Sequence, residues 1–381
     1  MADGGKTYQC GILGLGAMGS AAAYHLTRRG WDVIGFEQFE FGHSYGSSHG
    51  QSRVFRTTYE DPFYVQWAVE ALSMWRTLET ESERELLDLC GLLVFANQGN
   101  PRFSDAISAL CANGIPHEII DGSEASSRTE YLSLPDETMV LFGEQNGYLR
   151  ADRAVNTMRM KAVEQGALLL DNCKVTDVFS DDSPRRVVTT QGDFRVEQLI
   201  VTAGPWLTQV IASLRIPIVI TREQKVYFKL IDGTGVGLGR WPVFCDYETG
   251  NYGFPSVDNQ TIKVAADHAG IEVGPNNVNR VVDAHYIKDM ACWLNRVAPH
   301  CMESFYSGSV CLYSTTPDRD FVLGRHPKDD RMVIAGGFSG HGFKFSVLIG
   351  DILADLVIHG DTHRDIDRLD PARFHSINED P

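Results

Sequence analysis

The stretch Gln9-Cys10-Gly11-Ile12-Leu13-Gly14-Leu15-Gly16-Ala17-Met18-Gly19 decides the fold of this chain. Residues 9–13 read as a short apolar strand, and the three glycines that follow have the spacing G-x-G-x-x-G. A helix-like stretch over residues 20–29, closed by Gly30, comes next, and a second strand over residues 32–36 ends in Glu37. Strand, glycine turn, helix, strand and acid in this order predict a βαβ unit that binds a dinucleotide.

The residues of this turn each have a physical task. Gly14 permits the tight turn, Gly16 lets the backbone approach a pyrophosphate, and Gly19 lets the helix pack closely on the strand. The first N–H groups of the helix, around Ala17 and Met18, lack partners inside the helix and suit phosphate oxygens. These features predict that the turn holds the phosphates of the cofactor.

Glu37 lies 23 residues after Gly14. Its carboxylate can accept hydrogen bonds from both ribose hydroxyls and would repel a 2′-phosphate. The motif therefore predicts a dinucleotide without a 2′-phosphate, and it leaves NAD and FAD open.

Length and composition narrow the class of protein. A chain of 381 residues is too long for one ordinary core and indicates two domains. The net charge of −16 argues against nucleic acid or an anionic membrane as partner. No stretch approaches the ~20 apolar residues of a membrane span. The eight cysteines have no regular spacing, which favours reduced thiols, and we expect no metal site. Residues 1–6 lack a secretory signal and residues 378–381 a targeting tripeptide, so we expect a cytoplasmic protein.

Glycine-rich strand-to-helix turns recur in the middle and near the end of the chain. The strand 198–202 runs into Ala203-Gly204-Pro205-Trp206, and the strand 332–335 runs into the turn 336–346 and an apolar helix to about residue 358. Residues 46–56 add a cluster of glycine, histidine and arginine that an NAD dehydrogenase does not need. Each turn alone is an ordinary α/β connection. A large, extended cofactor contacted by all of them explains the arrangement, which favours FAD.

Taken together, these segments resemble the monomeric sarcosine oxidase family, which also includes N-methyltryptophan oxidase and pipecolate oxidase. The resemblance runs almost end to end and rests on residues 14–19, 46–56, 252–255, 263, 308–313 and 337–346. It implies an α/β fold in which two domains interleave. A Rossmann-like FAD domain would comprise residues 1–84, 143–215 and 306–381. A mixed-sheet substrate domain would comprise residues 85–142 and 216–305, with a helical span over 278–296.

The resemblance also implies roles for four residues. Cys311 matches the family cysteine that forms a thioether with the flavin, so it implies covalently bound FAD. Lys263 matches the lysine that faces flavin N5 through water, where a cation stabilises developing superoxide. Arg56 and Lys344 match the two residues that bind the substrate carboxylate, a task that suits paired cations.

Further site residues follow from the same resemblance. Arg53 and His49 match positions beside the flavin ring, and Tyr313 matches a catalytic position near its edge. The residues expected to line the substrate pocket are Tyr59, Tyr252, Cys245 and His341. Additional cofactor contacts are expected at Ser47, Ala203, Gly204, Gly337, Gly340, Gly342 and Phe343, beside Arg53, Cys311 and Lys344. Any one of the aromatic or histidine side chains also fits an ordinary core position.

The chain departs from the family pattern inside the pocket. Asp267, four residues after Lys263, stands where family members commonly carry His, and His268 follows it. This resembles the Lys…Asp-Glu-His pattern of fructosyl amino acid (Amadori product) oxidases. Cys245 stands where sarcosine oxidase has Met, and Ser48 replaces a second His. The pocket is therefore not that of sarcosine oxidase itself.

The predicted reaction is the oxidation of a secondary amino acid, N-methyl, N-substituted or cyclic, to an imine, with reduction of O2 to H2O2. The expected partners are the amino acid and O2, and the chain is expected to be a monomer or a weak oligomer. An Amadori-product oxidase and a dehydrogenase with another electron acceptor are the alternatives. A nicotinamide dehydrogenase would be distinguished by the absence of a bound yellow chromophore. A non-catalytic flavin-binding module is least favoured, because it needs neither the paired cations nor Lys263.

Overall fold

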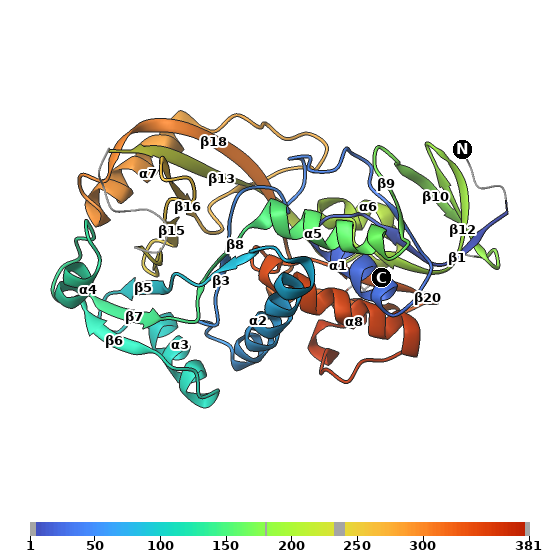
Figure 1. Ribbon diagram of the computed structural model, residues 1–381, viewed down its shortest axis with the longest axis horizontal. Coiled ribbons are helices and arrows are strands. Elements are labelled where there is room, and N and C mark those ends of the chain that lie inside the picture. Colours follow the sequence, from blue (N-terminus) through green and yellow to red (C-terminus); the bar gives the residue numbers. More distant parts are fainter. Residues whose placement is uncertain (1–4, 180, 232–240, 378–381) are drawn as a thin grey trace.

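A sheet of eight strands carries the fingerprint in the computed structural model, which describes residues 5–179, 181–231 and 241–377 (Figure 1). Its strands are β1 (Thr7–Leu13), β2 (Val33–Phe36), β9 (Leu168–Leu170), β10 (Val175–Phe179), β11 (Arg185–Thr189), β12 (Gly192–Val201), β19 (Val322–His326) and β20 (Asp329–Gly336). The order is β10-β11-β12-β1-β2-β9, and β20 pairs with β12 and β19. Strands β20, β12, β1, β2 and β9 are parallel. The end of the chain therefore returns to the sheet that its beginning starts.

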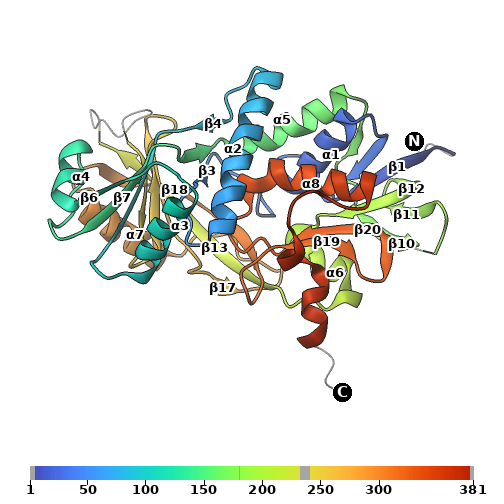
Figure 2. The ribbon, with the colours of Figure 1, turned by 90° about the horizontal axis from the view of Figure 1, so that it is seen from below.

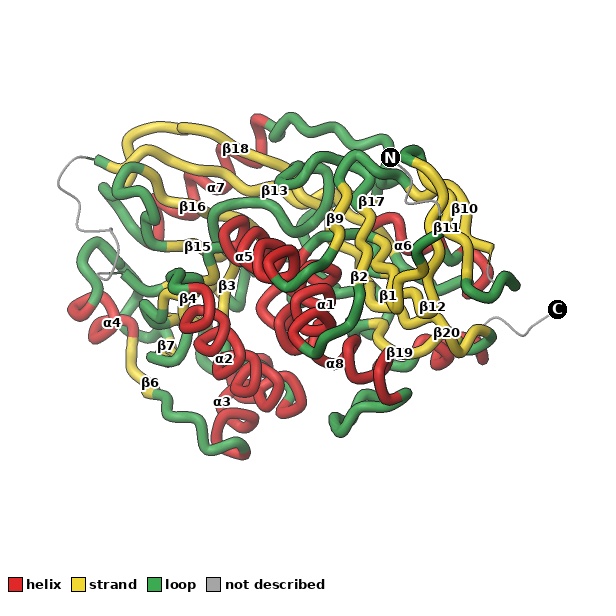
Figure 3. Tube along the Cα trace, turned by 45° about the vertical axis from the view of Figure 1, so that its right-hand side comes forward, coloured by secondary structure: helices red, strands yellow, loops and turns green. Residues whose placement is uncertain are grey.

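Helices cover this sheet closely (Figure 3). Helix α1 (Ala17–Arg28) packs against α5 (Ala151–Glu164) and α8 (Ser346–His359), and α8 also contacts α2 (Pro62–Ser82). A Cβ on Gly350 of α8 would lie 2.5 Å from the Cβ of Ala21 in α1, so glycine permits this close approach. Helix α8 is apolar around most of its surface because it is buried between neighbours.

A second, mixed sheet of nine strands forms the other half of the molecule (Figure 2). Its order is β17 (Ile271–Glu272), β13 (Val219–Leu230), β16 (Thr261–Ala266), β15 (Asn251–Phe254), β14 (Val243–Asp246), β5 (Leu92–Ala96), β7 (Met139–Gly143) and β6 (Glu118–Asp121). Helices α3 (Pro101–Ala112), α4 (Gly122–Arg128) and α7 (Ala284–Val297) pack on it. Phe244 and Trp293 stack at 5.6 Å in the core between α7 and the sheet.

Two long strands connect the halves of the molecule (Figures 1 and 2). Strand β18 (Met302–Thr315) pairs with β13 over nearly its whole length, from Leu230↔Met302 to Val219↔Thr315. The first half of β18 is exposed and its end around Cys311 is buried. Ser47 Oγ donates a hydrogen bond to Leu312 O at 2.6 Å, which ties the end of β18 to residues 46–56.

The remaining elements are small. A three-stranded sheet joins β3 (Arg53–Phe55), β8 (Gly147–Leu149) and β4 (Leu87–Asp88). The short helices are α6 (Leu207–Val210), η1 (Gly204–Trp206), η2 (Ala212–Leu214), η3 (Phe343–Phe345), η4 (Asp367–Leu369) and η5 (Pro371–Ile377). Of the helices in the described ranges, none combines the length and apolar character that a membrane span requires.

The predicted α/β class is confirmed, and two predicted helices need correction. The first helix begins at Ala17, three residues before the predicted start, because the glycine turn itself enters the helix. The helix predicted over 278–296 begins only at Ala284. Arg222 of β13 holds the preceding segment outside the helix, since its guanidinium donates to Asn279 O at 2.7 Å and pairs with Asp283 at 2.9 Å. The expectation of a cytoplasmic location rests partly on residues 1–4 and 378–381, which lie outside the described residues.

Candidate functional site

A cavity of about 860 Å³ extends from the fingerprint turn to strands β14, β15 and β16 of the second sheet. Nearly all of the predicted site residues line it, although they come from segments far apart in the chain. They are Gly14, Gly16, Ala17, Met18, Glu37, Ser47, His49, Arg53, Arg56, Ala203, Gly204, Cys245, Tyr252, Lys263, Cys311, Tyr313, Gly337, Gly340, His341, Gly342, Phe343 and Lys344. Gly19 and Tyr59 do not line the cavity.

The fingerprint turn has no room for side chains. Gly14 has φ +94°, and a Cβ there would lie 2.6 Å from Thr202 O. A Cβ on Gly19 would lie 1.9 Å from Gly14 O, so Gly19 serves the packing of α1 rather than the cavity wall. Gly16 is the N-cap of α1 and provides no side-chain cap. Gly16, Ala17 and Met18 line the cavity, so the helix N-terminus faces it, as phosphate binding requires. One of its N–H groups, that of Ala17, donates to Ser48 Oγ at 3.0 Å.

The carboxylate of Glu37 stands beside this turn. The residue is 6% exposed, and its Oε2 and Oε1 accept hydrogen bonds from the N–H groups of Leu15 at 3.1 Å and Phe39 at 3.2 Å. These bonds fix the carboxylate at the end of β2. A glycine turn, a helix N-terminus that faces the cavity and a buried acid are the parts that the adenosine end of a dinucleotide needs, so the residues present fit the group.

Lys263 of β16 lies in the middle of the cavity wall. It is 5% exposed, and its Nζ donates to Ser52 O at 2.8 Å and Ser52 Oγ at 3.0 Å, 3.7 Å from the centroid of the Phe254 ring. Burial, followed by the charges of Arg53 and Lys225, holds its pKa well below the usual value. The lysine is therefore fixed in place and poised to gain stability from negative charge appearing nearby.

Arg53 and His49 shape the same region. The Arg53 guanidinium donates to Ser47 O at 2.9 Å and His49 O at 2.6 Å, which holds residues 46–56 around it. Burial, with the charges of Lys225 and Arg53, lowers the pKa of His49 and favours its neutral ring. Its Nε2 is buried and has no hydrogen-bond partner among the described residues.

Arg56 and Lys344 form the other end of the site. Lys344 Nζ donates to Tyr59 Oη and to His341 O, both at 2.7 Å, and the residue is 4% exposed. The Arg56 guanidinium lies 4.3 Å from the centroid of the Tyr59 ring and donates to Tyr247 Oη at 3.3 Å. Tyr59, predicted as a pocket wall, instead lies behind the two cations and positions them.

The electrostatics of these cations differ. Burial, then the charge of Arg56, holds the pKa of Lys344 well below its usual value. Burial by itself would lower the pKa of Arg56, but the neighbouring groups, chiefly Tyr247 and Tyr59, have the larger combined effect, so the pKa of the guanidinium is raised. A bound carboxylate would favour the charged form of Lys344, so the pair is suited to an anionic ligand.

The C-terminal glycine turn packs against the pocket aromatics. A Cβ on Gly340 would lie 2.4 Å from the ring of Tyr313, and one on Gly342 would lie 2.5 Å from Phe338 Cβ. These contacts fix the Tyr313 ring, whose hydroxyl donates to Asp267 Oδ1 at 3.4 Å. Burial holds the pKa of Tyr313 well above its usual value, so the hydroxyl stays protonated.

Among the cavity residues that the sequence did not predict as site residues are Lys225, Glu223, Tyr247 and Asp267. Glu223 and Lys225 are 3% and 5% exposed and project from the same face of β13. Glu223 of β13 lies opposite Cys311 of β18 in the antiparallel register of these two strands. Glu223 and Lys225 could have been predicted as site residues, because two charged residues at alternate positions of a buried strand are a signal of such a role. Tyr247, directly after β14, had no such signal.

Comparisons with known proteins agree with this architecture. A model of the FAD-dependent oxidoreductase family matches residues 10–356. Monomeric sarcosine oxidase of Streptomyces avermitilis is 33% identical over 376 residues, covering 97% of this chain and 98% of the relative. N-methyl-L-tryptophan oxidase of Yersinia pestis is 28% identical over 378 residues, covering 96% and 99%. NikD, an unusual amino acid oxidase essential for nikkomycin biosynthesis, has the same fold, with a TM-score of 0.86 at 22% identity over 96% of this chain and 98% of NikD. The predicted resemblance is confirmed, and the chain belongs to the FAD-dependent oxidoreductase family.

Proposed function

We propose that this protein oxidises a secondary amino acid, N-methyl, N-substituted or cyclic, to an imine and passes the electrons to O2, forming H2O2. The observation that carries the proposal is the continuity of the cavity, which joins the fingerprint turn to the Arg56–Lys344 pair. A dinucleotide held at the first end reaches toward a carboxylate held at the second. The names of the sarcosine and N-methyltryptophan oxidases support an N-substituted amino acid as substrate.

The residues divide the work along the cavity. Arg56 and Lys344 bind the substrate carboxylate, and Tyr59 keeps both cations in place. FAD, when bound, supplies the two-electron acceptor. Lys263 offers a buried positive charge to the oxygen half of the reaction, where negative charge develops. His49, whose neutral ring is favoured, and charged Arg53 line the cavity together with Lys263 and the Arg56–Lys344 pair.

Cys311 is the proposed point at which the FAD is covalently attached. It is 9% exposed, lines the cavity and lies at the end of β18 that Ser47 ties to residues 46–56. Protein precipitated with acid should keep its yellow colour, and the intact mass should exceed the chain mass by about one FAD. Release of all flavin into the supernatant would contradict the attachment. The interleaved domain boundaries remain a prediction.

The substrate is tested by mixing the enzyme with candidates without oxygen and following the loss of yellow colour. The panel contains sarcosine, pipecolate, N-methyltryptophan and fructosyl-glycine. Bleaching by a secondary amino acid, followed by peroxide on admission of air, supports the proposal. Preference for fructosyl-glycine would favour an Amadori-product oxidase, and bleaching without peroxide would favour a dehydrogenase. No bleaching by any member would contradict the proposed function.

A further inference from the structure

The substrate end of the cavity carries a negative charge in addition to the Arg56–Lys344 pair. Asp267 directly follows β16 and lines the same cavity as Arg56 and Lys344. Its N–H donates to Gly250 O at 2.9 Å, which fixes the turn that presents the side chain. Its carboxylate accepts a hydrogen bond from the Tyr313 hydroxyl at 3.4 Å. Within the described residues, Asp267 forms no ion pair.

The charge of Asp267 acts across the pocket. Burial is the main cause that raises the pKa of Tyr252 and Tyr313, and the charge of Asp267 raises both further. Burial and the charge of Arg56 lower the pKa of Lys344, and the charge of Asp267 partly offsets this. Asp267 is exposed and, among the described residues, is not paired with a cation, so its carboxylate is free to attract a cationic group of a ligand that fills the cavity.

Glu223 does not supply a second equal charge. It lines the cavity but is 3% exposed, and its Oε2 has no hydrogen-bond partner among the described residues. Burial, with a smaller effect of Asp267, raises the pKa of this carboxyl and favours its neutral form. Asp246 lines the cavity too, but it is 5% exposed and its Oδ2 already accepts hydrogen bonds from Thr249 Oγ1 at 2.7 Å and Trp293 Nε1 at 3.1 Å. Asp267, by contrast, is exposed.

Two cations and one anion match an amino acid near neutral pH, which has a carboxylate and an ammonium separated by one carbon. We propose that Asp267 is the counter-ion of the substrate's ammonium group, and that it selects zwitterions over carboxylates with a neutral group at that position. The inference rests on the proposed function, because it takes the Arg56–Lys344 pair as the carboxylate site. It assigns Asp267 to specificity, in addition to the cations expected from the sequence.

A matched pair of ligands isolates this charge. Glycine betaine and 3,3-dimethylbutanoate have the same shape and the same carboxylate, but betaine has N⁺ where the other has carbon. Betaine has no nitrogen lone pair and no N–H, so it is not oxidised as an amine and tests charge alone. Dissociation constants are measured on the flavin-loaded protein by calorimetry and by the change in flavin absorbance.

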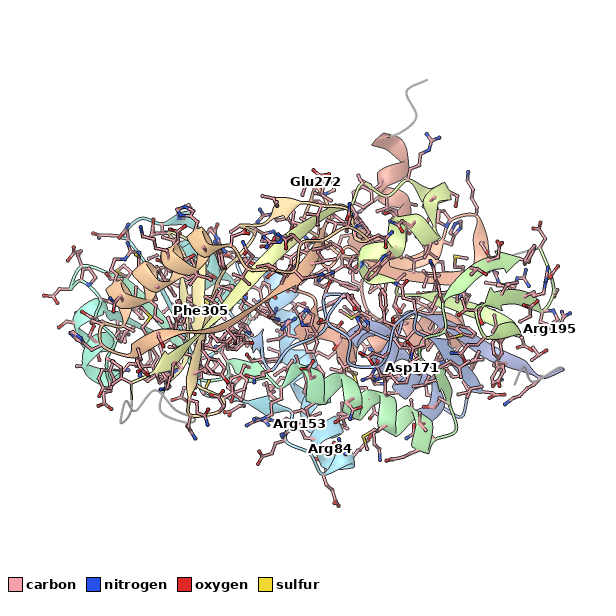
Figure 4. The ribbon with its side chains drawn as sticks, turned by 90° about the horizontal axis from the view of Figure 1, so that it is seen from above. Arg84, Arg153, Asp171, Arg195, Glu272 and Phe305 are labelled. Carbon is pink, nitrogen blue, oxygen red and sulfur yellow. The ribbon has the colours of Figure 1, made fainter. Side chains whose placement is uncertain are left out.

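Wild-type protein should bind betaine about tenfold more tightly than its carbon analogue, a ratio equivalent to about 1.4 kcal/mol. Asp267→Asn, which keeps the size and a hydrogen-bond acceptor, should bring the ratio to about one, and Asp267→Glu should retain part of the preference. Glu272→Gln is the matched control, because Glu272 is an exposed carboxylate on β17, away from the cavity lining (Figure 4). Its ratio should equal that of the wild type.

The possible outcomes distinguish failure of the Asp267 assignment from failure of the proposed function. Equal binding of the two ligands by the wild type, or an undiminished preference in a flavin-loaded Asp267→Asn protein, would overturn the assignment of Asp267 while amino acids still bleach the flavin. If neither ligand binds and no amino acid bleaches the flavin, the proposed function fails and the inference fails with it.

Discussion

Lys344→Met tests the carboxylate site most directly. Methionine has nearly the length of lysine, so the substitution removes the ammonium group and preserves most of the volume. It removes the hydrogen bonds to Tyr59 Oη and His341 O. It also removes a charge whose burial is unfavourable. These effects on folding oppose each other, so we expect the unfolding free energy to change by about 1 kcal/mol or less.

The effect on binding should be much larger. A hydrogen bond between a charged donor and a charged acceptor contributes about 1.5–3 kcal/mol. Its loss corresponds to a rise of about 10- to 150-fold in the substrate dissociation constant. Arg56 remains and should hold the carboxylate more weakly. Stopped-flow reduction without oxygen gives the dissociation constant and the limiting rate separately.

Lys263→Met is the matched control, since it also replaces a buried cavity lysine with methionine. It should leave the dissociation constant of the substrate within about threefold while affecting the later reaction with O2. If Lys344→Met retained flavin and bound the amino acid as tightly as the wild type, Lys344 would not be a carboxylate ligand. Equal weakening by both substitutions would indicate a general disturbance of the cavity.

Three further predictions concern other parts of the molecule. Cys311→Ser should bind FAD that acid precipitation releases, whereas wild-type flavin should stay with the protein pellet; retention by the variant would exclude this cysteine. Lys263→Met should slow the reaction of reduced enzyme with O2 at least tenfold more than flavin reduction, and equal slowing in stopped-flow traces would remove its oxygen role. Asp351→Asn should destabilise the protein by about 1–2 kcal/mol at pH 7 in denaturant titrations, because the carboxylate pairs with His25 at 3.1 Å and Arg364 at 2.9 Å. Burial raises the pKa of Asp351, but the hydrogen bond and charge of His25 and the arginine charges outweigh it and depress the pKa. The stabilisation is therefore complete above the unfolded pKa of about 4 and lost as pH falls through the lower folded pKa, so a difference that grew in acid would contradict the assignment.

The features that the sequence predicted correctly are local ones. The fingerprint strand, turn and helix span residues 7–28 in the structure, and their order follows from apolar strand residues and from glycines where a Cβ would collide with backbone. Helix boundaries were less predictable where a distant side chain intervened. Arg222 holds the segment before Ala284 outside the helix, and the pattern around residues 278–283 contains no sign of this contact.

The site residues show the same division. Lys344 and Tyr59 are 285 residues apart in the chain, yet they share a hydrogen bond, and only packing shows that Tyr59 supports the cations from behind. Lys225 and Glu223 read as ordinary strand residues until β13 lies between β16 and β18 and buries them.

The sequence by itself determined the dinucleotide turn, the α/β class and the identity of the cations, because each depends on the steric or chemical properties of residues within a short segment. Only the tertiary structure decided which charges share the cavity. The burial of Lys263, the hydrogen bond from Arg56 to Tyr247 and the presence of Asp267 in the same cavity as Arg56 and Lys344 depend on packing between distant segments. Electrostatic interactions act through space, so their partners are set by packing and not by distance along the chain.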